Sequence, residues 1–262
     1  MGHAASAQFK GFPMNGLSLF QHSLRQVTGN FAAAIRISAL LYLAQVAVGT
    51  LIDLPLLTDE AAMRSAIEGG TFPWGKLVLI VVVAVVSNLW IAVAWHRFVL
   101  RVEMPASLVP AFHGGAILAY FGRMIAIGLV LAVPMMALMA LTGPVAVTGG
   151  PMARLATVLV VAVPVSTLFF RIGAILPAAA LDQPLKLAEA WRRTAGATPA
   201  LAGLALLFLG ASLAIDLPAT ALPQGSVPQL VWLGLTGWVK AMVGISALTT
   251  IYGHYIEGRA LR

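Results

Sequence analysis

The sequence contains no cysteine and few charged residues, and each shortage excludes a class of protein. Without cysteine the chain has no disulfide framework, no thiol nucleophile and no thiolate metal site. Charged residues make up 10% of the 262 positions, hydrophobic residues make up 60%, and the mean hydropathy is +0.93. This composition leaves too little polar surface to cover a soluble protein of such length. The sequence therefore predicts an integral membrane protein of the all-α class.

Catalytic motifs are also missing. The chain has neither G-x-S-x-G nor H-E-x-x-H, and it lacks the phosphate-binding pattern G-x-x-x-x-G-K-[ST]. We therefore expect no enzymatic activity, no cofactor and no metal site. An intramembrane enzyme that uses none of these motifs is the alternative.

The clearest membrane span is the stretch from Leu77 to Trp95, in which only Ser87 and Asn88 are polar. At about 1.5 Å per residue it makes about 28 Å of helix, which is close to the thickness of the hydrocarbon core of a bilayer. A polar stop follows at once with His96 and Arg97. Similar apolar runs predict six spans in all, over residues 31–52, 77–95, 116–141, 152–171, 200–215 and 227–252, with a short turn over 143–151.

The segment before the first span, residues 1–30, has no continuous apolar run and does not resemble a cleaved signal peptide. Apolar residues recur in it every three or four positions, which predicts an amphipathic helix lying at the membrane interface. They are Leu17, Phe20, Leu24, Val27 and Phe31. This helix is either a simple lead-in to the first span or a docking surface for a partner protein.

Two further short helices are expected outside the spans. One follows the first span, with Thr58 as its N-cap and Gly69 just past its end. The other is an interfacial helix over residues 183–195, with Asp182 as its N-cap and an i,i+4 pair between Glu189 and Arg193. The apolar run 172–181 before it is too short to cross the membrane, and we expect it at the inner interface.

Basic residues predict the orientation of the spans. Twelve lie on the side of the two termini, three lie on the other side, and Lys240 is intramembrane. The twelve are Lys10, Arg25, Arg36, Arg97, Arg101, Arg123, Arg171, Lys186, Arg192, Arg193, Arg259 and Arg262, and the three are Arg64, Lys76 and Arg154. The positive-inside rule then places both termini in the cytoplasm of a bacterium, with the protein in its inner membrane. Orientation and contact with anionic lipid explain the net charge of +7 without nucleic acid, and another membrane protein is a further possible partner.

An internal repeat is suggested by one tetrapeptide. Residues 52–55 and 215–218 share the sequence Ile-Asp-Leu-Pro, in each case at the end of a predicted span. Interfacial segments precede the three odd-numbered spans. The pattern predicts a three-fold repeat of an interfacial helix plus a membrane hairpin, unless the tetrapeptide recurs by chance in a biased composition.

This layout resembles a group of uncharacterised bacterial six-span inner-membrane proteins. The resemblance rests on the exit Trp95-His96-Arg97-Phe98 and on the ending Tyr252-Gly253-His254-Tyr255-Ile256-Glu257. These proteins are similar in layout to the membrane domain of some glycerophosphodiester phosphodiesterases. The resemblance implies a six-span fold. Because a second, soluble domain is missing, it transfers no catalytic residue to this chain.

Lys240 is a candidate ligand-binding residue because it falls near the middle of the last span. A lysine at the centre of a membrane helix costs about 2.5–3.5 kcal/mol on an insertion scale, so it should face the interior of the bundle. Its side chain would bind an anion or a lipid phosphate, or it would be a structural amine satisfied by Asn88, Ser166 or Thr236.

The other candidates lie at the inner ends of the spans. They are His96, Arg97, Arg123, Arg171, His254 and Glu257. We interpret them as a belt that contacts lipid headgroups. The alternative is a metal site built on the i,i+3 pair His254 and Glu257. Such sites use several further carboxylates, and the sequence offers none there.

Two functions are consistent with these features. The preferred one is a non-enzymatic assembly, scaffold or lipid-interacting component of the membrane. The alternative is a small transporter or channel that uses Lys240 to bind an anionic or amphiphilic solute.

Overall fold

Six long apolar helices dominate the computed structural model, which describes residues 15–51, 60–104 and 107–261. Each of the six is long and apolar enough to cross a membrane, and the described residues contain no strand. The predicted all-α polytopic membrane fold is confirmed. In chain order the helices are α1 (Gly16–Thr28), α2 (Phe31–Leu51), α4 (Glu60–Glu68), α5 (Trp74–Arg101), α6 (Gly114–Thr148), α7 (Gly150–Ile172), α8 (Ile175–Ala180), α9 (Leu187–Arg193), η1 (Ala195–Ala197), α10 (Thr198–Asp216), η2 (Leu217–Ala221), α11 (Val227–Ile251) and η3 (Tyr252–Ile256).

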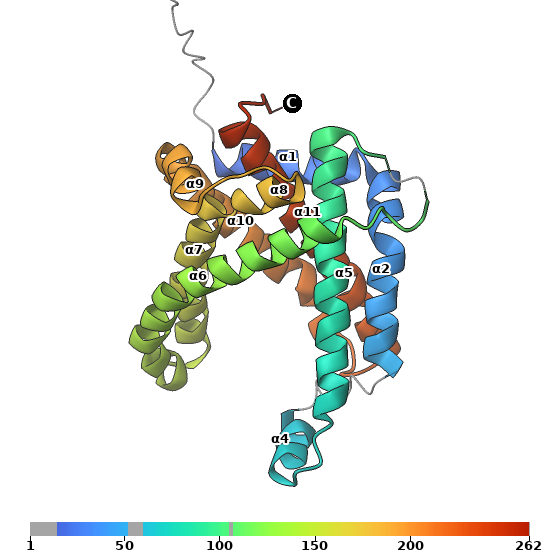
Figure 1. Cartoon of the computed structure of the whole chain (residues 1–262). Coiled ribbons are helices and arrows are strands. Elements are labelled where there is room, and N and C mark those ends of the chain that lie inside the picture. Colours follow the sequence, from blue (N-terminus) through green and yellow to red (C-terminus); the bar gives the residue numbers. More distant parts are fainter. Residues whose placement is uncertain (1–14, 52–59, 105–106, 262) are drawn as a thin grey trace, which may run out of the picture.

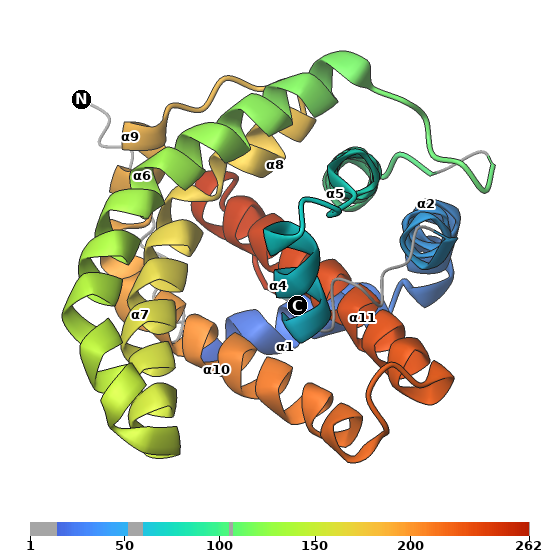
Figure 2. The ribbon, with the colours of Figure 1, turned by 90° about the horizontal axis from the view of Figure 1, so that it is seen from below.

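The molecule has two distinct ends (Figure 1). We call the end with α1, α8, α9 and the C-terminal residues the basic end, and the end from which α4 projects the opposite end. Between them α2 packs against α5, and α6 packs against α7. Helix α10 packs against α7 and α1, while α11 packs against α1 and α5, so that the spans surround the centre of the bundle as Figure 2 shows.

Helix α1 lies across the basic end, packed on α10 and α11. The predicted helix is confirmed, and only part of its predicted apolar stripe packs against the protein. Gly16, Leu19, Ser23 and Val27 are buried, whereas Leu17 is 49% exposed. The predicted stripe residue Phe31, which begins α2, is 54% exposed as well. Small residues face the protein because they allow the backbones to approach closely.

Helices α5, α6, α7 and α10 are longer than the apolar runs that predicted them. Helix α5 continues through the predicted polar stop to Arg101, since those polar side chains find partners inside the protein. Helix α6 contains Pro134, as predicted, but it also continues through Pro144 to Thr148, so the predicted turn over 143–151 is wrong. The chain reverses only where Gly150 adopts a φ of 73°, a conformation that glycine tolerates best.

The segment between α7 and α10 differs from the two interfacial elements predicted there. Helix α8 lies at the basic end, where it is buried by protein and packs against α6 and α5. Of the predicted helix 183–195 only α9 and the short η1 turn are helical, and Asp182 does not cap it because its carboxylate turns away toward Arg97. The predicted pair of Glu189 and Arg193 is confirmed, with 2.7 Å between oxygen and nitrogen.

The three predicted repeat units are not equivalent. Helices precede α2 and α10, but the described residues of the segment ahead of α6, 102–104 and 107–113, contain none. In addition, α10 and α11 do not pack along each other as the first two helix pairs do. The first copy of the tetrapeptide, like the predicted N-cap Thr58, lies outside the described residues. Helix α4 itself is present and Gly69 follows it, as expected.

Candidate functional site

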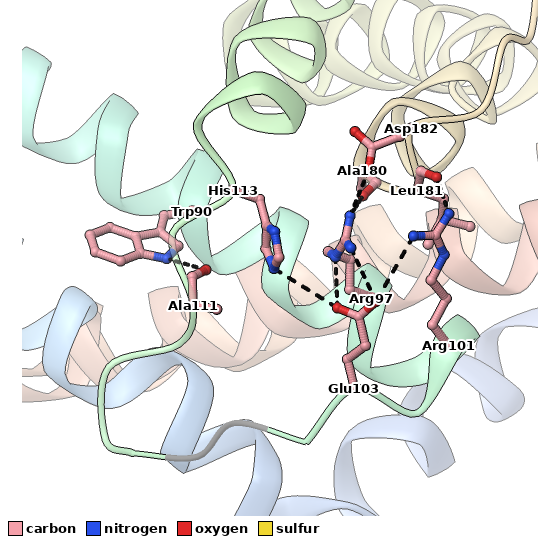
Figure 3. A network of polar contacts seen from close by, with 9 residues as sticks. All are labelled: Trp90, Arg97, Arg101, Glu103, Ala111, His113, Ala180, Leu181 and Asp182. Carbon is pink, nitrogen blue, oxygen red and sulfur yellow. Dashed lines mark hydrogen bonds and ion pairs between the residues drawn. The ribbon is translucent and has the colours of Figure 1, made fainter.

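Arg97, near the end of α5, is the centre of a polar network at the basic end (Figure 3). Its guanidinium is bidentate to Glu103, with Nε 2.7 Å from Oε2 and Nη2 3.1 Å from Oε1. Its Nη1 donates to the carboxylate of Asp182 at 2.8 Å and to the carbonyl of Ala180 at 3.0 Å. The side chain is buried, and bidentate pairs of this kind are among the strong hydrogen bonds in proteins. Arg97 therefore binds within the protein instead of reaching a lipid headgroup.

Two unusual backbone conformations position its carboxylate partners. Val102 has a φ of 58° and Asp182 a φ of 56°, and no other non-glycine residue in the described ranges has a positive φ. Val102 caps α5 in the left-handed conformation, and Glu103 follows it. A left-handed conformation at a non-glycine residue costs energy, and such residues often lie at functional sites, where the surrounding structure keeps them in that conformation. Both strained residues lie next to Arg97, so the network is the first candidate for a functional site.

A cavity of about 320 Å³, lined by both polar and apolar side chains, lies beside this network between α2, α5 and the segment that leads to α6. Glu103 forms its charged wall, with Arg101 Nη1 3.9 Å from Oε1 and His113 Nε2 3.8 Å from Oε2. The same segment is anchored to α5 by Trp90, whose Nε1 donates to the carbonyl of Ala111 at 3.2 Å (Figure 3). The positive and negative charges of the network balance, and they leave no surplus charge facing the cavity.

Two further arginines, one on α5 and one on α6, also bind the chain segment around α8. Arg101 donates to the carbonyl of Leu181, and Arg123 donates to the carbonyls of Ile175 and Gln183 at 2.6 and 3.3 Å. The carbonyls of Ala180 and Leu181 close the C-terminal end of α8, where a helix attracts cations. Arginines from α5 and α6 therefore hold this segment against the bundle. We call Arg97, Arg101 and Arg123 the arginine clamp.

Arg171, at the end of α7, makes a different set of contacts. Its guanidinium stacks on the ring of Trp191, with Cζ 3.4 Å from the ring centroid, and its Nη2 donates to the carbonyl of the same residue at 3.0 Å. It is 9% exposed, and its Nε is buried without a hydrogen-bond partner. Of the described arginines predicted as headgroup ligands, Arg97 thus has two carboxylate partners and Arg171 has none.

The two candidate histidines lie in different environments. His96 is fully buried, with Nδ1 2.8 Å from the Thr249 hydroxyl and Nε2 3.3 Å from the Tyr120 hydroxyl, so the predicted headgroup contact is wrong for this residue. His254 Nδ1 donates to the carbonyl of Arg259 at 2.9 Å, and Glu257 binds the Arg259 guanidinium at 2.6 Å. Within the described ranges no group of three or more His, Asp or Glu residues is arranged to hold a metal ion.

Lys240 forms an ion pair with Asp216, the last residue of α10. Its Nζ lies 2.8 and 2.7 Å from the two carboxylate oxygens, and Thr236 Oγ1 donates to one of them at 3.3 Å. Thr236 therefore belongs to the site as a partner of the carboxylate. The partner of the Lys240 ammonium is Asp216, an acid that the sequence had placed at the outer end of its span. The reason is that the end of α10 packs beside the middle of α11, where Trp232 Nε1 donates to the carbonyl of Ile215 at 2.9 Å.

Two apolar cavities open on the flanks of the spans. One of about 480 Å³ lies between α5, α6 and α11, with Ala92, Met124 and Ile245 in its walls. The other, of about 560 Å³, is a groove between α2 and α11 whose walls include Ile35, Val231 and Leu235, each at least 40% exposed. Lys240 lines neither of them.

Sequence reasoning missed the acidic partners Glu103, Asp182 and Asp216. A usable signal was present, because Glu103 and Asp182 lie in the segments that follow two predicted spans, on the same side as the arginines. An acid in a strongly basic region is a candidate for an internal ion pair.

Comparison of the chain with protein families, with curated proteins and with solved structures finds no match.

Proposed function

We propose that this protein is a non-enzymatic, lipid-interacting component of the bacterial inner membrane that holds lipid chains along its flanks. The groove between α2 and α11 is the observation that carries the proposal. Its volume lies within the roughly 300–1,000 Å³ range of small-ligand sites, and its lining is almost entirely apolar. Because the groove opens from membrane-spanning helices, the hydrocarbon of the bilayer is the medium that fills it.

The second support is the way in which the protein uses its polar groups. Arg97 is paired with carboxylates, Arg101 and Arg123 bind backbone carbonyls, and Lys240 is paired with Asp216. Polar groups committed to internal partners hold a bundle together but do not line a path for a charged solute. The alternative of an anion transporter requires Lys240 to leave Asp216, which binds it through both carboxylate oxygens.

Orientation belongs to the same proposal. Arg97, Arg101 and Arg171 lie near the last residues of α5 and α7, at the basic end. Arg64 lies in α4, and Lys76 and Arg154 lie near the first residues of α5 and α7, at the opposite end (Figure 1). We infer from the positive-inside rule that the basic end faces the cytoplasm. The resemblance in layout to the membrane domain of some glycerophosphodiester phosphodiesterases agrees with a lipid-related role.

Filling the groove tests the proposal. Gly234 lines it on α11 and a Cβ added there meets no atom within 4 Å, so the variant Gly234→Leu places a side chain into the groove. The protein is released from vesicles into a mild detergent, and the phospholipids that remain bound are counted by native mass spectrometry. We expect the variant to retain fewer lipids than the wild type.

The matched control is Gly210→Leu on α10. A Cβ at Gly210 likewise meets no atom within 4 Å, and the residue lines neither apolar cavity. The control should retain as many lipids as the wild type. Equal lipid retention by Gly234→Leu and the wild type would contradict a role of the groove in holding lipid.

A further inference from the structure

Arg171 is a buried cation whose charge is not matched by an acid. Its exposed fraction is 9%, and no carboxylate in the described ranges forms an ion pair with it. Of its three guanidinium nitrogens only Nη2 donates to a described acceptor, the carbonyl of Trp191, and the buried Nε has no partner. A buried charge without a counter-charge is costly. An anion bound to this guanidinium would offset that cost.

The surroundings of Arg171 hold its guanidinium in a fixed position. The Trp191 ring covers one face of the guanidinium, and Thr194 Oγ1 donates to the Arg171 carbonyl at 3.0 Å, which binds α9 to the end of α7. The ring and the C-terminal end of α7 each provide partial negative charge, but neither provides a full one. Because stacking covers only a face of the guanidinium and Nη2 donates to the Trp191 carbonyl, Nη1 and Nε are the in-plane donors that have no described acceptor.

The local charge selects the sign of that ligand. Arg192 and Arg193 follow Trp191 in α9, and of these Arg193 is paired with Glu189 while Arg192 is exposed. The neighbourhood of Arg171 is therefore positive overall. Planar, in-plane donors match phosphate oxygens, and tryptophan is typical of the headgroup depth of a membrane.

We propose that Arg171 and Trp191 form a binding site for a phosphate anion, supplied by the headgroup of an anionic phospholipid or by a soluble phosphate. For the headgroup source the inference rests on the lipid-interacting function proposed above and adds the class of lipid. Arg171 binds the phosphate through its in-plane N–H groups, and Trp191 holds the guanidinium in place.

The first test measures lipid selectivity. Wild-type protein is reconstituted into vesicles of equal parts phosphatidylglycerol and phosphatidylcholine, extracted, and analysed for bound lipid by native mass spectrometry. We expect enrichment of phosphatidylglycerol in the wild type and about tenfold less enrichment in Arg171→Gln, since charge-assisted hydrogen bonds contribute selectivity of that order. Arg154→Gln is the matched control, because Arg154 also lies on α7 and donates to one carbonyl, but at the opposite end. It should keep the wild-type enrichment.

The second test distinguishes the two sources of phosphate. Delipidated protein is titrated with inorganic phosphate in a calorimeter. Binding that Arg171→Gln abolishes assigns the site to a soluble phosphate, whereas no binding together with Arg171-dependent enrichment of phosphatidylglycerol assigns it to the lipid headgroup. Unchanged enrichment in Arg171→Gln with no Arg171-dependent phosphate binding overturns the proposal.

The variant Arg171→Met distinguishes a loss of binding from a loss of folding, because it removes the buried charge and keeps an apolar side chain. In detergent without phosphatidylglycerol we expect it to unfold at a temperature at least equal to that of the wild type. Added phosphatidylglycerol should raise the unfolding temperature of the wild type and not that of the variant. An equal rise in both proteins contradicts the site. The lipid count of Gly234→Leu reports on the groove separately, so failure of the groove and failure of the phosphate site are distinguishable.

Discussion

Lys240 and Asp216 form an ion pair between the middle of α11 and the end of α10, with both carboxylate oxygens within 2.8 Å of Nζ. A lysine amine that is held in this way does not need a ligand to offset its charge. The pair also fixes where α10 ends against α11. Its first role is therefore to join two spans.

Removing either partner should destabilise the protein, because the remaining charge loses its counter-charge. We expect Lys240→Met and Asp216→Asn each to lower the unfolding temperature in detergent. In a double-mutant cycle the two changes should be less than additive, with a coupling energy of about 0.5–3 kcal/mol. Additive effects would mean that the two side chains do not interact. A transporter that used Lys240 would instead lose uptake of its anion in Lys240→Met alone.

The six spans could be predicted because length and apolar content are local properties of the sequence. The run from Leu77 to Trp95 identified α5, and the positions of α10 and α11 differ from the predicted ranges by only a few residues. Helix faces could not be predicted in the same way. In a membrane both lipid and protein favour apolar side chains, so the stripe on α1 indicated a helix but not the side of it that meets the protein.

The candidate site could be predicted less well from the sequence because the residues that pair in it are far apart in the chain. Arg97 and Asp182 are 85 positions apart, and Lys240 and Asp216 are 24 apart. Only the packing of the helices brings such residues together. The sequence identified Arg97 and Arg171 as candidate headgroup ligands. Whether an arginine is paired with an acid or left without one depends on contacts that no local pattern contains.

The closest approach between α1 and the bundle depends on Gly16. A Cβ added at Gly16 would lie 2.4 Å from backbone atoms of Gly203 and Leu204, which cannot move as a side chain can. We expect Gly16→Ala to lower the free energy of unfolding by about 1–3 kcal/mol, the usual cost of overpacking. Gly210→Ala on α10, where an added Cβ meets open space, serves as the control and should leave it unchanged. Equal thermal unfolding of the two variants would show that α1 does not pack as closely as described.

Relief of the backbone strain at Val102 should stabilise the protein. Its φ of 58° is unfavourable for a branched side chain, and the residue is 75% exposed, so little packing is lost on truncation. We expect Val102→Gly to raise the free energy of unfolding by up to about 1 kcal/mol, after the entropic cost of glycine is subtracted. Val145→Gly, at an exposed position in α6 with a negative φ, should instead lower it by about 0.5–1 kcal/mol. A loss of stability in Val102→Gly, measured by thermal unfolding in detergent, would contradict the strained conformation.

The proposed orientation can be tested by labelling single introduced cysteines, because the chain has no cysteine of its own that would react. Lys186 at the basic end and Ser65 in α4 are both exposed, so Lys186→Cys and Ser65→Cys report on the two sides of the membrane. If the basic end faces the cytoplasm, a membrane-impermeant maleimide should label Lys186→Cys in inside-out vesicles and Ser65→Cys in intact spheroplasts. Each variant should stay unlabelled in the other preparation until detergent is added, which also shows that its thiol is reactive. The reverse pattern would place the arginine clamp and the Arg171 site outside the cytoplasm. Labelling of both variants from one side would contradict the three spans α5, α6 and α7 between α4 and α9.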